Sequence, residues 1–461
     1  MARYLLNIFI GALIFQLVGY FIAGCAQIGA PTGGPRDTLA PILVKANPEN
    51  KKTNFNYNKI VLDFNEYIEL QDLSANLSIS PLPKLNPLIS SNLKTITIKL
   101  KDSLLPNTTY NIDFGNSIKD INEGNVYKSF AYQFSTGNSI DSFTIQGKVV
   151  LAETGKVDST LIVLLYKNLN DSAVKTQRPN YISKLDGSGH FKFSYLPNQN
   201  FNVYVLKDGD GNKFYNSLTE VFGFLNKIVN STETDSDITL FAYKEKNENN
   251  AIATTPQKKE KQLKYILNLN NGKQDLLMPL SLNFNNPIQT LLSDSIFITD
   301  TNYHTIAGVS TQIDSSRKQI LLDTKWLPES IYYLLINANA VKDSSGLALS
   351  KTDTIKFVTK SKDDYGSVKL NFSHLDTIKH PIMLLFEGDQ LKYKIPLTTN
   401  SWFNKMMLPA ELEIRILYDE NNNGHWDPGN YSQKIQPEKV IAIPSKMTIK
   451  ANWENENDIV L

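Results

Sequence analysis

Residues 130–137 read Phe-Ala-Tyr-Gln-Phe-Ser-Thr-Gly, and this stretch decides the fold class. Its aromatic side chains, Phe130, Tyr132 and Phe134, stand at every second position. Because successive side chains of a strand point to opposite faces, this spacing predicts a β-strand with one buried face. The same period of two recurs in short runs bounded by Asn, Asp, Gly and Pro, at residues 95–100, 110–114, 191–195, 201–205 and 412–416.

These runs predict antiparallel strands joined by turns. After position 30, no stretch of ten or more residues carries a clear helical stripe, and only a short helical segment near residues 219–226 stays open. The chain has 461 residues, whereas a single hydrophobic core rarely grows beyond about 250–300 residues. We therefore expect an all-β protein made of four β-sandwiches in series.

An internal duplication sets the domain order. Residues 63–68 (DFNEYI) are echoed at residues 283–288 (NFNNPI), 220 positions later, and residues 208–212 are echoed at 419–423, 211 positions later. A repeat of this length indicates that a pair of domains was copied once. Between the copies, residues 243–262 (YKEKNENNAIATTPQKKEKQ) have almost nothing to bury, which is typical of a linker.

The expected layout has four domains, named here A1, B1, A2 and B2. We expect each hydrophobic core to stay on its own side of the linker, so that the two halves fold independently. The predicted boundaries are 1–24 for a signal peptide, 25–40 for a flexible tether, 41–138 for A1, 139–243 for B1, 244–262 for the linker, 263–360 for A2 and 361–461 for B2.

The amino terminus predicts export and lipidation at Cys25, the single cysteine. Arg3 precedes an uncharged apolar run at residues 5–22, and the small residues Ala23 and Gly24 follow. Residues 22–25 (Ile-Ala-Gly-Cys) resemble the lipobox of bacterial lipoproteins. That resemblance implies cleavage before the cysteine and acylation of its thiol. The alternative is an uncleaved anchor helix, for which the run of about 18 residues is short against a ~30 Å hydrocarbon core.

Domain A1 resembles the bacterial Ig-like module first named from an S-layer protein, and A2 resembles a degenerate copy in which Leu347 and Lys360 replace the Asn and Gly of the pattern. Domains B1 and B2 resemble prealbumin-like sandwiches of the carboxypeptidase-regulatory type, on residues 189–193 and Leu196-Pro197. These folds host many functions. The residues of A1 that carry the resemblance are Pro41, 64–68, 105–110, Asp120, Gly124-Asn125 and 134–137.

Each B domain carries an acidic loop that predicts a calcium site, and Ca²⁺ is the one cofactor the sequence suggests. Oxygen ligands at alternate positions suit Ca²⁺, which takes six to eight oxygens. The B2 loop has Gly424 at position 6 of an EF-hand-type pattern, but Asn430 replaces the bidentate Glu at position 12. The alternative is a hairpin turn stabilised by Asx side chains. The candidate ligands are Asp419, Asn421, Asn423 and Asp427 in B2, and Asp208, Asp210 and Asn212 in B1.

Composition and motifs favour a non-enzymatic protein. The 47 basic and 46 acidic residues balance, which argues against nucleic-acid binding. The sequence contains no G-x-S-x-G, Walker or H-E-x-x-H motif. We expect a scaffold or protein-interaction subunit of the cell envelope, anchored in a membrane by the lipid on Cys25, with other envelope proteins as partners.

The residues after the cysteine refine this expectation. Ala26 and Gln27 follow Cys25. In the lipoprotein family an Asp at the first of these positions retains the protein in the inner membrane. Its absence suggests the outer membrane, on either face, within a secretion or outer-membrane protein assembly. The alternative function is a surface glycan-binding or uptake accessory lipoprotein, for which Trp426, beside the acidic loop, is the most suggestive residue.

Overall fold

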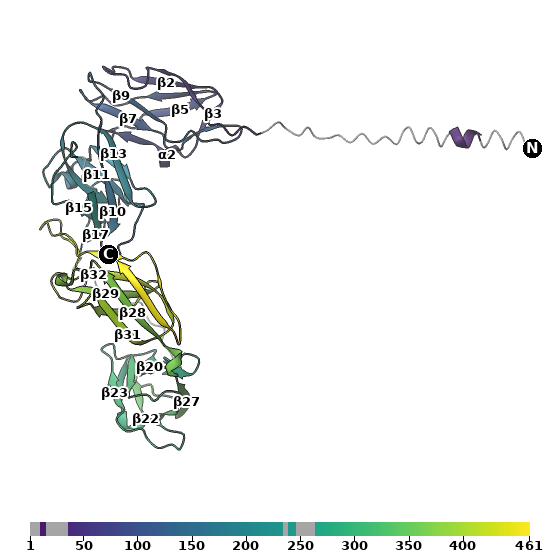
Figure 1. Cartoon of the computed structure of the whole chain (residues 1–461), viewed down its shortest axis with the longest axis vertical. Helices are drawn as coiled ribbons and strands as arrows, with labels where there is room; N and C mark the ends of the chain where they lie inside the picture. Colours follow the sequence, from purple (N-terminus) through teal and green to yellow (C-terminus); the bar gives the residue numbers. More distant parts are fainter. Residues whose placement is uncertain (1–9, 15–35, 234–237, 246–262) are drawn as a thin grey trace, which may run out of the picture. The chain divides into compact units, whose positions relative to one another are not determined.

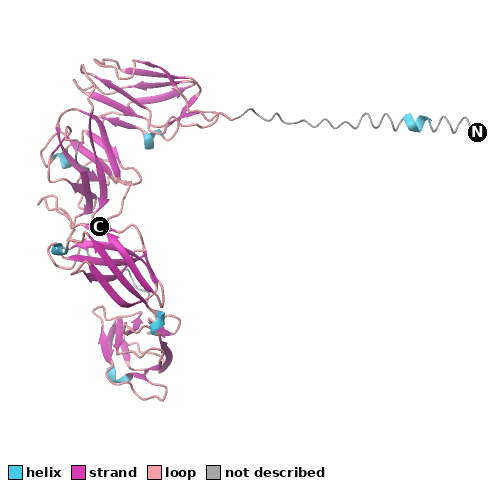
Figure 2. Cartoon of the chain, in the orientation of Figure 1, coloured by secondary structure: helices cyan, strands magenta, loops and turns pink. Residues whose placement is uncertain are grey.

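The computed structural model describes residues 10–14, 36–233, 238–245 and 263–461. Strands dominate the described chain, and the helices are short (Figure 2). Residues 10–14 are helical, and no helix in the described ranges is long and apolar enough to span a bilayer. The chain divides into two compact units, residues 1–141 and residues 142–461. Figure 1 labels strands of both units and colours the chain along its sequence. The predicted lipidation site, Cys25, lies outside the described residues.

Domain A1 surrounds one core with two sheets and a two-stranded ribbon. The side chains of Tyr132 and Phe134 are fully buried there, as their spacing predicts. The four-stranded sheet has the order β1 (Leu43–Asn47), β2 (Lys59–Phe64), β6 (Thr95–Lys99), β5 (Leu88–Asn92); the three-stranded sheet is β4 (Ser78–Ser80), β7 (Thr109–Asp113), β9 (Ala131–Ser135); the ribbon pairs β3 (Ile68–Leu70) with β8 (Ile118–Asp120), and α2 spans Leu73–Asn76.

Domain B1 is one continuous hydrogen-bonded sheet of eight strands that curves around its own core. Alternate residues of one strand, such as Phe201, Val203 and Val205, enter that core. The order is β12 (Tyr181–Lys184), β11 (Ile162–Tyr166), β14 (Asn200–Leu206), β15 (Val221–Phe224), β17 (Ile238–Lys244), β10 (Phe143–Leu151), β13 (His190–Leu196), with β16 (Val229–Asn230) on β14 and the helix α3 (Ala173–Thr176) between β11 and β12.

Domain A2 repeats the plan of A1. Its core includes Trp326, Tyr332 and Phe357. One sheet has the order β18 (Tyr265–Leu267), β20 (Leu280–Phe284), β24 (Gln319–Asp323), β23 (Ser310–Ile313); the other is β19 (Lys273–Gln274), β27 (Asp353–Thr359), β25 (Ile331–Ile336), β22 (Ile296–Thr299); the ribbon pairs β21 (Ile288–Leu291) with β26 (Val341–Asp343), and η1 is Ser293–Ser295.

Domain B2 packs a three-stranded sheet and a larger sheet around a core that includes Leu370, Met383 and Ile416. The first sheet has the order β31 (Ser401–Met407), β28 (Gly366–Ser373), β35 (Glu454–Val460). The second is β30 (Gln390–Pro396), β29 (Pro381–Glu387), β32 (Ala410–Tyr418), β33 (Val440–Ala442), with β34 (Met447–Ile449) also on β32; the short helices are η2 (Lys362–Asp364) and η3 (Thr377–Lys379).

The predicted all-β series of sandwiches is confirmed, with two corrections. Three strand pairs are parallel rather than antiparallel: β10 with β17, β19 with β27, and β28 with β35. In each case the two strands are not consecutive in the chain, so no hairpin turn dictates their direction. The helical segment left open near residues 219–226 is strand β15, whose four residues are all buried.

The duplication extends to matching side-chain hydrogen bonds in A1 and A2. In A1 the hydroxyl of Tyr110 accepts from the backbone N–H of Leu105 at 2.7 Å. In A2 the hydroxyl of Tyr332 accepts from the N–H of Leu327 at 3.4 Å. The buried carboxylates of the two equivalent turns match as well. Asp120 accepts from the N–H of Asn125 at 2.7 Å, and its counterpart in A2 accepts likewise from the N–H of Leu347.

Candidate functional site

The acidic loop of B2 connects β32 to β33 and is built around a buried carboxylate. Asp419 is fully buried, and its two oxygens accept from the backbone N–H groups of Asn423 at 3.0 Å and Gly424 at 2.6 Å. The amide nitrogens of Asn421 and Asn423 lie 2.6 and 2.5 Å from one oxygen of Asp427. The structure thus brings the four predicted ligands of B2 together. Whether they hold Ca²⁺ stays a prediction, because the same contacts also make an Asx-stabilised turn.

Glu438 is a further carboxylate of this loop that the sequence pattern does not reveal. Its oxygens accept from the backbone N–H groups of Glu420 and Asp427, each at 3.0 Å. Burial and, to a smaller extent, the negative charges of Asp419 and Asp427 raise the pKa of Glu438. The ligand spacing of an EF-hand ends at position 12, whereas Glu438 lies further along the chain and returns to the loop just before β33.

The acidic loop of B1 shares one backbone contact with that of B2, because the N–H of Lys213 donates to Asp208 at 3.1 Å, and differs in its other contacts. The N–H of Asn212 donates to Asp210 at 3.1 Å, and the amide nitrogen of Asn212 lies 2.5 Å from the other oxygen of Asp210. The ammonium of Lys213 lies 3.9 Å from Asp208. A cation of the protein itself therefore sits beside one of the three predicted ligands. Calcium binding at this loop stays a prediction, and Lys213 would compete for the same carboxylate.

The residue that fails the calcium pattern, Asn430, has a structural role. The backbone groups of Asn430 and Ile435 exchange two hydrogen bonds, of 2.8 and 2.9 Å, and so close a tight loop. The side-chain oxygen of Asn430 also accepts from Ser432 at 2.7 Å and from the N–H of Gln433 at 3.0 Å. This loop carries Tyr431 at its first position, directly after the closing residue.

Tyr431 of B2 is inserted into a buried aromatic cluster of B1. Only 3% of its surface is exposed. Its ring centroid lies 5.1 Å from those of Phe222 and Phe224, at interplanar angles of 68° and 67°. Such edge-to-face contacts add about 0.5–1.5 kcal/mol per pair beyond area burial. The cluster lies on the face of β14 and β15 opposite to the core of B1, and includes Leu164, Tyr166, Tyr204, Leu206, Tyr215, Phe222, Phe224 and Tyr243.

Hydrogen bonds fix Tyr431 in this position. Its hydroxyl lies 3.0 Å from the hydroxyl of Tyr204 and donates to the carbonyl oxygen of Asp171 at 2.9 Å. Its backbone N–H donates to the carboxylate of Glu245 at 3.1 Å, and Tyr215 donates to the same oxygen at 2.8 Å. Burial is the main cause that raises the pKa of Tyr431. The polar atoms that enter B1 with this side chain are therefore satisfied there.

Further contacts surround Tyr431. Lys434 forms an ion pair with Asp171 at 2.6 Å, and its ammonium lies 4.0 Å from the ring centroid of Tyr431. The amide of Gln436 donates to the carbonyl oxygen of Phe224 at 3.0 Å. A Cβ added at Gly429 would lie 2.5 Å from the ring of Tyr243, so this close approach of the two domains requires glycine. We call this set of contacts the Tyr431 junction.

The Tyr431 junction overturns the expectation that cores stay on their own side of the linker. The aromatic cluster combines residues before the linker, such as Tyr204, with Tyr431 after it. A sequence signal for it exists in strand β14, whose last four residues, Val203–Leu206, are all apolar and buried. Strict alternation would leave Tyr204 and Leu206 in solvent, whereas a continuous apolar run indicates that both faces of a strand are covered.

A second junction joins B2 to A2. The hydroxyl of Tyr365 donates to Asp275 at 2.8 Å and accepts from the N–H of Leu276 at 2.7 Å. Lys273 of A2 forms an ion pair with Asp364 at 3.3 Å. Only 3% of the surface of Tyr365 is exposed. Buried tyrosines therefore tie B2 to both of the other domains in the unit formed by residues 142–461.

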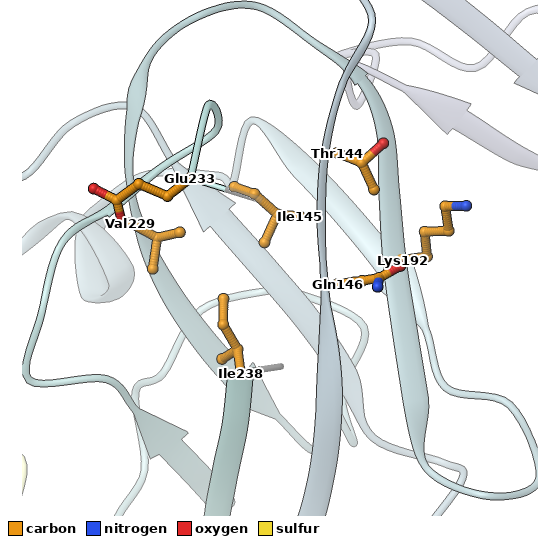
Figure 3. A pocket seen from close by; sticks show the side chains of 7 residues that line it. All are labelled: Thr144, Ile145, Gln146, Lys192, Val229, Glu233 and Ile238. Carbon is orange, nitrogen blue, oxygen red and sulfur yellow. The ribbon is translucent and has the colours of Figure 1, made fainter. Parts of the chain in front are cut away.

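Cavities also lie within single domains. One in B1 has a volume of about 260 Å³ and lies between strands β10, β13, β16 and β17. Figure 3 shows Glu233 and Lys192 on opposite sides of it, with Ile145 between them and Val229 on the side of Glu233. Among the described residues, no group of three or more His, Cys, Asp and Glu side chains is arranged to hold a metal ion.

Comparison with known families supports the assignment of A1. Residues 37–136 match the model of a family described as a bacterial Ig-like domain. The Ig-like resemblance expected for A1 is thereby confirmed, and the prealbumin-like resemblance of the B domains stays a prediction. A search of the curated proteins finds no match to this chain.

Several solved structures of bacterial proteins are similar to this chain. One is the TIE protein of Bacillus anthracis, with 11% identity, a TM-score of 0.17 and coverage of 94% of this chain and 76% of that one. The major pilin subunit BcpA of Bacillus cereus has 10% identity and a TM-score of 0.16, over 69% of this chain and 99% of that one. The N-terminal part of the bacterial S-layer protein SbsC has 13% identity and a TM-score of 0.16, over 44% of each chain. At these scores, no function follows from the similarity.

Proposed function

We propose that this protein is a non-enzymatic scaffold of the cell envelope that presents protein-interaction surfaces from a lipid anchor on Cys25. The observation that carries the proposal is the Tyr431 junction. A chain of independent sandwiches would bend at every connection, whereas buried side chains fix B2 against B1 and A2. A junction of this kind suits a protein that holds a binding surface in a set orientation.

The anchor and the location are proposed from the sequence. The lipobox-like residues 22–25 support lipidation, and Ala26 in place of Asp supports the outer membrane. With two or three acyl chains, each buried CH₂ contributes about 0.8 kcal/mol, so the anchor is effectively permanent. The proposed partners are other proteins of an outer-membrane assembly, of the kind that secretes proteins or inserts them into that membrane.

Purification of the tagged full-length protein from its own cell envelope in mild detergent tests this function. The proposal predicts that envelope proteins co-purify in fixed ratio with the wild-type chain, and that fewer are retained by Tyr431→Ala, in which the orientation of B2 against B1 is lost. The exposed Tyr303→Ala is the matched control and should retain them all. A wild-type protein that purifies alone, yet binds on a glycan array, would contradict the scaffold role and favour the glycan-binding alternative.

A further inference from the structure

A cleft lies between the outer face of the larger B2 sheet and the β10–β11 connection of B1. Its volume is about 460 Å³, which falls within the usual range of about 300–1,000 Å³ for ligand pockets. Domain B1 contributes Glu153, Thr154 and Lys156, and all other lining residues belong to B2. Both domains are parts of the same compact unit.

Arg415 is the central residue of the cleft. It lies on β32, opposite Leu384 of β29 and Ala442 of β33. Its guanidinium carbon lies 3.9 Å from the ring centroid of Phe386, and its side chain is only 8% exposed. A charge this deeply buried is costly unless its donors are satisfied.

The donors of Arg415 are only partly satisfied. One terminal nitrogen lies 3.3 Å from Glu413, and that carboxylate also pairs with Lys156 at 2.8 Å. The Nε of Arg415 is buried and has no acceptor among the described residues. A guanidinium presents five N–H donors in a planar fork that matches a carboxylate. The buried Nε is out of reach of a ligand, so the terminal nitrogens are the donors that Arg415 can offer to an oxygen acceptor in the cleft.

The other charged residues limit the ligand to one negative charge. Lys394 also lines the cleft, and none of the ion pairs of the described chain includes it. Two exposed carboxylates, Glu153 and Asp389, line it as well. A polyanion would be repelled by these carboxylates, whereas a single carboxylate meets less repulsion and is attracted by Arg415 and Lys394, which both lie opposite Leu384 in the sheet.

Much of the remaining lining is apolar, apart from Thr154 and His425, and it lies beside a free strand edge. Leu384 and Leu391 contribute aliphatic surface, Leu417 also lines the cleft but is only 1% exposed, and Trp426 forms part of the wall. The indole N–H of Trp426 already donates to the carbonyl oxygen of Glu438 at 3.0 Å, which leaves the ring for apolar contact. Strand β30 is the last strand of its sheet, so its outer edge is open to an added strand.

We propose that this cleft binds an extended peptide segment through one acidic side chain flanked by apolar residues. Arg415 and Lys394 pair with the carboxylate, and the leucines contact the flanking side chains. The inference deepens the proposed interaction role and rests on it for the natural source of the peptide. Binding of a peptide to the cleft can be measured on the purified protein alone, without its natural partner.

Equilibrium dialysis of the full-length protein in detergent tests the cleft. The probes are acetyl-Leu-Val-Glu-Val-Leu-amide and the same peptide with Gln in place of Glu. We expect the Glu peptide to bind at least tenfold more tightly than the Gln peptide. Arg415→Met should abolish this preference, and Lys394→Met should weaken binding of the Glu peptide about threefold without disturbing a buried group. Lys446→Met is the matched control, since Lys446 is exposed in B2 and pairs with Glu411 at 3.0 Å outside the cleft.

Equal binding of the two peptides, or a Glu preference that survives both cleft variants, would overturn the inference. Tighter binding of a galacturonate trimer than of the Glu peptide would overturn the peptide as ligand. Failure of this peptide-binding inference is distinguishable from failure of the proposed scaffold function. Co-purification of envelope proteins together with negative dialysis would leave the scaffold role intact and remove only this cleft.

Discussion

The hydroxyl groups of Tyr431 and Tyr204 lie 3.0 Å apart, although 227 positions of sequence separate the two residues. One belongs to the last domain and the other to a strand before the linker. The contact means that the duplicated B domains pack directly on each other. The duplicated domain pairs are therefore not two separate halves, because B2 of the second pair packs against B1 of the first.

Replacement of Tyr431 should weaken this joint structure in a graded way. Tyr431→Ala removes a buried ring, a change that typically costs about 3–5 kcal/mol for a large aromatic residue. Tyr431→Phe keeps the ring but leaves buried partners unsatisfied, at a cost of about 1–3 kcal/mol. Hydrogen exchange of the amides of β14 and β15 should be faster in Tyr431→Phe than in the wild type, and faster still in Tyr431→Ala. Tyr303→Ala, at a tyrosine that is 59% exposed, should leave exchange unchanged, and equal exchange in all variants would contradict the prediction.

The strand pattern of this protein was predictable from sequence because one face of most strands is buried. Residues such as Ile96 and Ile98 alternate with polar neighbours, and the structure buries both. The Tyr431 junction was not predictable in the same way. Tyr431 lies in a loop between strands, where no periodicity applies, and its partners are distant in the chain. Glu438 escaped prediction for a related reason, since its role depends on how the chain returns after the loop.

The equivalent turns of A1 and A2 predict a pH dependence of stability. Burial alone would raise the pKa of Asp343, but hydrogen bonds from Asn286, Leu347 and Ser345 outweigh it and hold the pKa below its ordinary value. A carboxyl with a depressed folded-state pKa contributes stability above its unfolded pKa of about 3.9, and this contribution is lost as the pH falls through the folded pKa. Asp343→Asn should therefore lower the melting temperature of A2 at pH 7 more than at pH 3.

The matched control for that experiment is the exposed Asp323→Asn in the same domain. Differential scanning calorimetry of the full chain at both pH values measures the difference between each variant and the wild type. Asp323→Asn should give a small difference at both values. A destabilisation by Asp343→Asn that is as large at pH 3 as at pH 7 would show that its carboxylate is not the stabilising species.

The acidic loop of B2 predicts a response to calcium. Binding of an ion to the folded state alone raises stability by mass action. The melting temperature of B2 should rise in millimolar Ca²⁺ and return with a chelator. Asp427→Asn should abolish the rise, because it removes ligand charge at an oxygen that holds Asn421 and Asn423 in the turn. If Ca²⁺ does not change the melting curve of the wild type, the calcium prediction is wrong and the loop is an Asx-stabilised turn that binds no ion.

The lipid anchor predicts a change of compartment on a single substitution. Cys25→Ser removes the thiol that would be acylated. The variant should leave the detergent phase of a phase-separation assay, and the wild type should stay there. Mass spectrometry of the wild-type amino terminus should show acylated Cys25 as the first residue. Unchanged partitioning of the variant would contradict lipidation at this position.

Cleavage of the linker tests the joint packing of B1 and B2 most directly. A sequence-specific protease site inserted after Pro256 would cut the chain between the domain pairs without touching any described residue. If the Tyr431 junction holds B2 against B1, the two fragments should co-elute on gel filtration in non-denaturing detergent. The fragments of a chain that also carries Tyr431→Ala should elute separately. Separation of the wild-type fragments immediately after cleavage would show that the two halves are independent, as the linker sequence alone suggests, and would contradict the account.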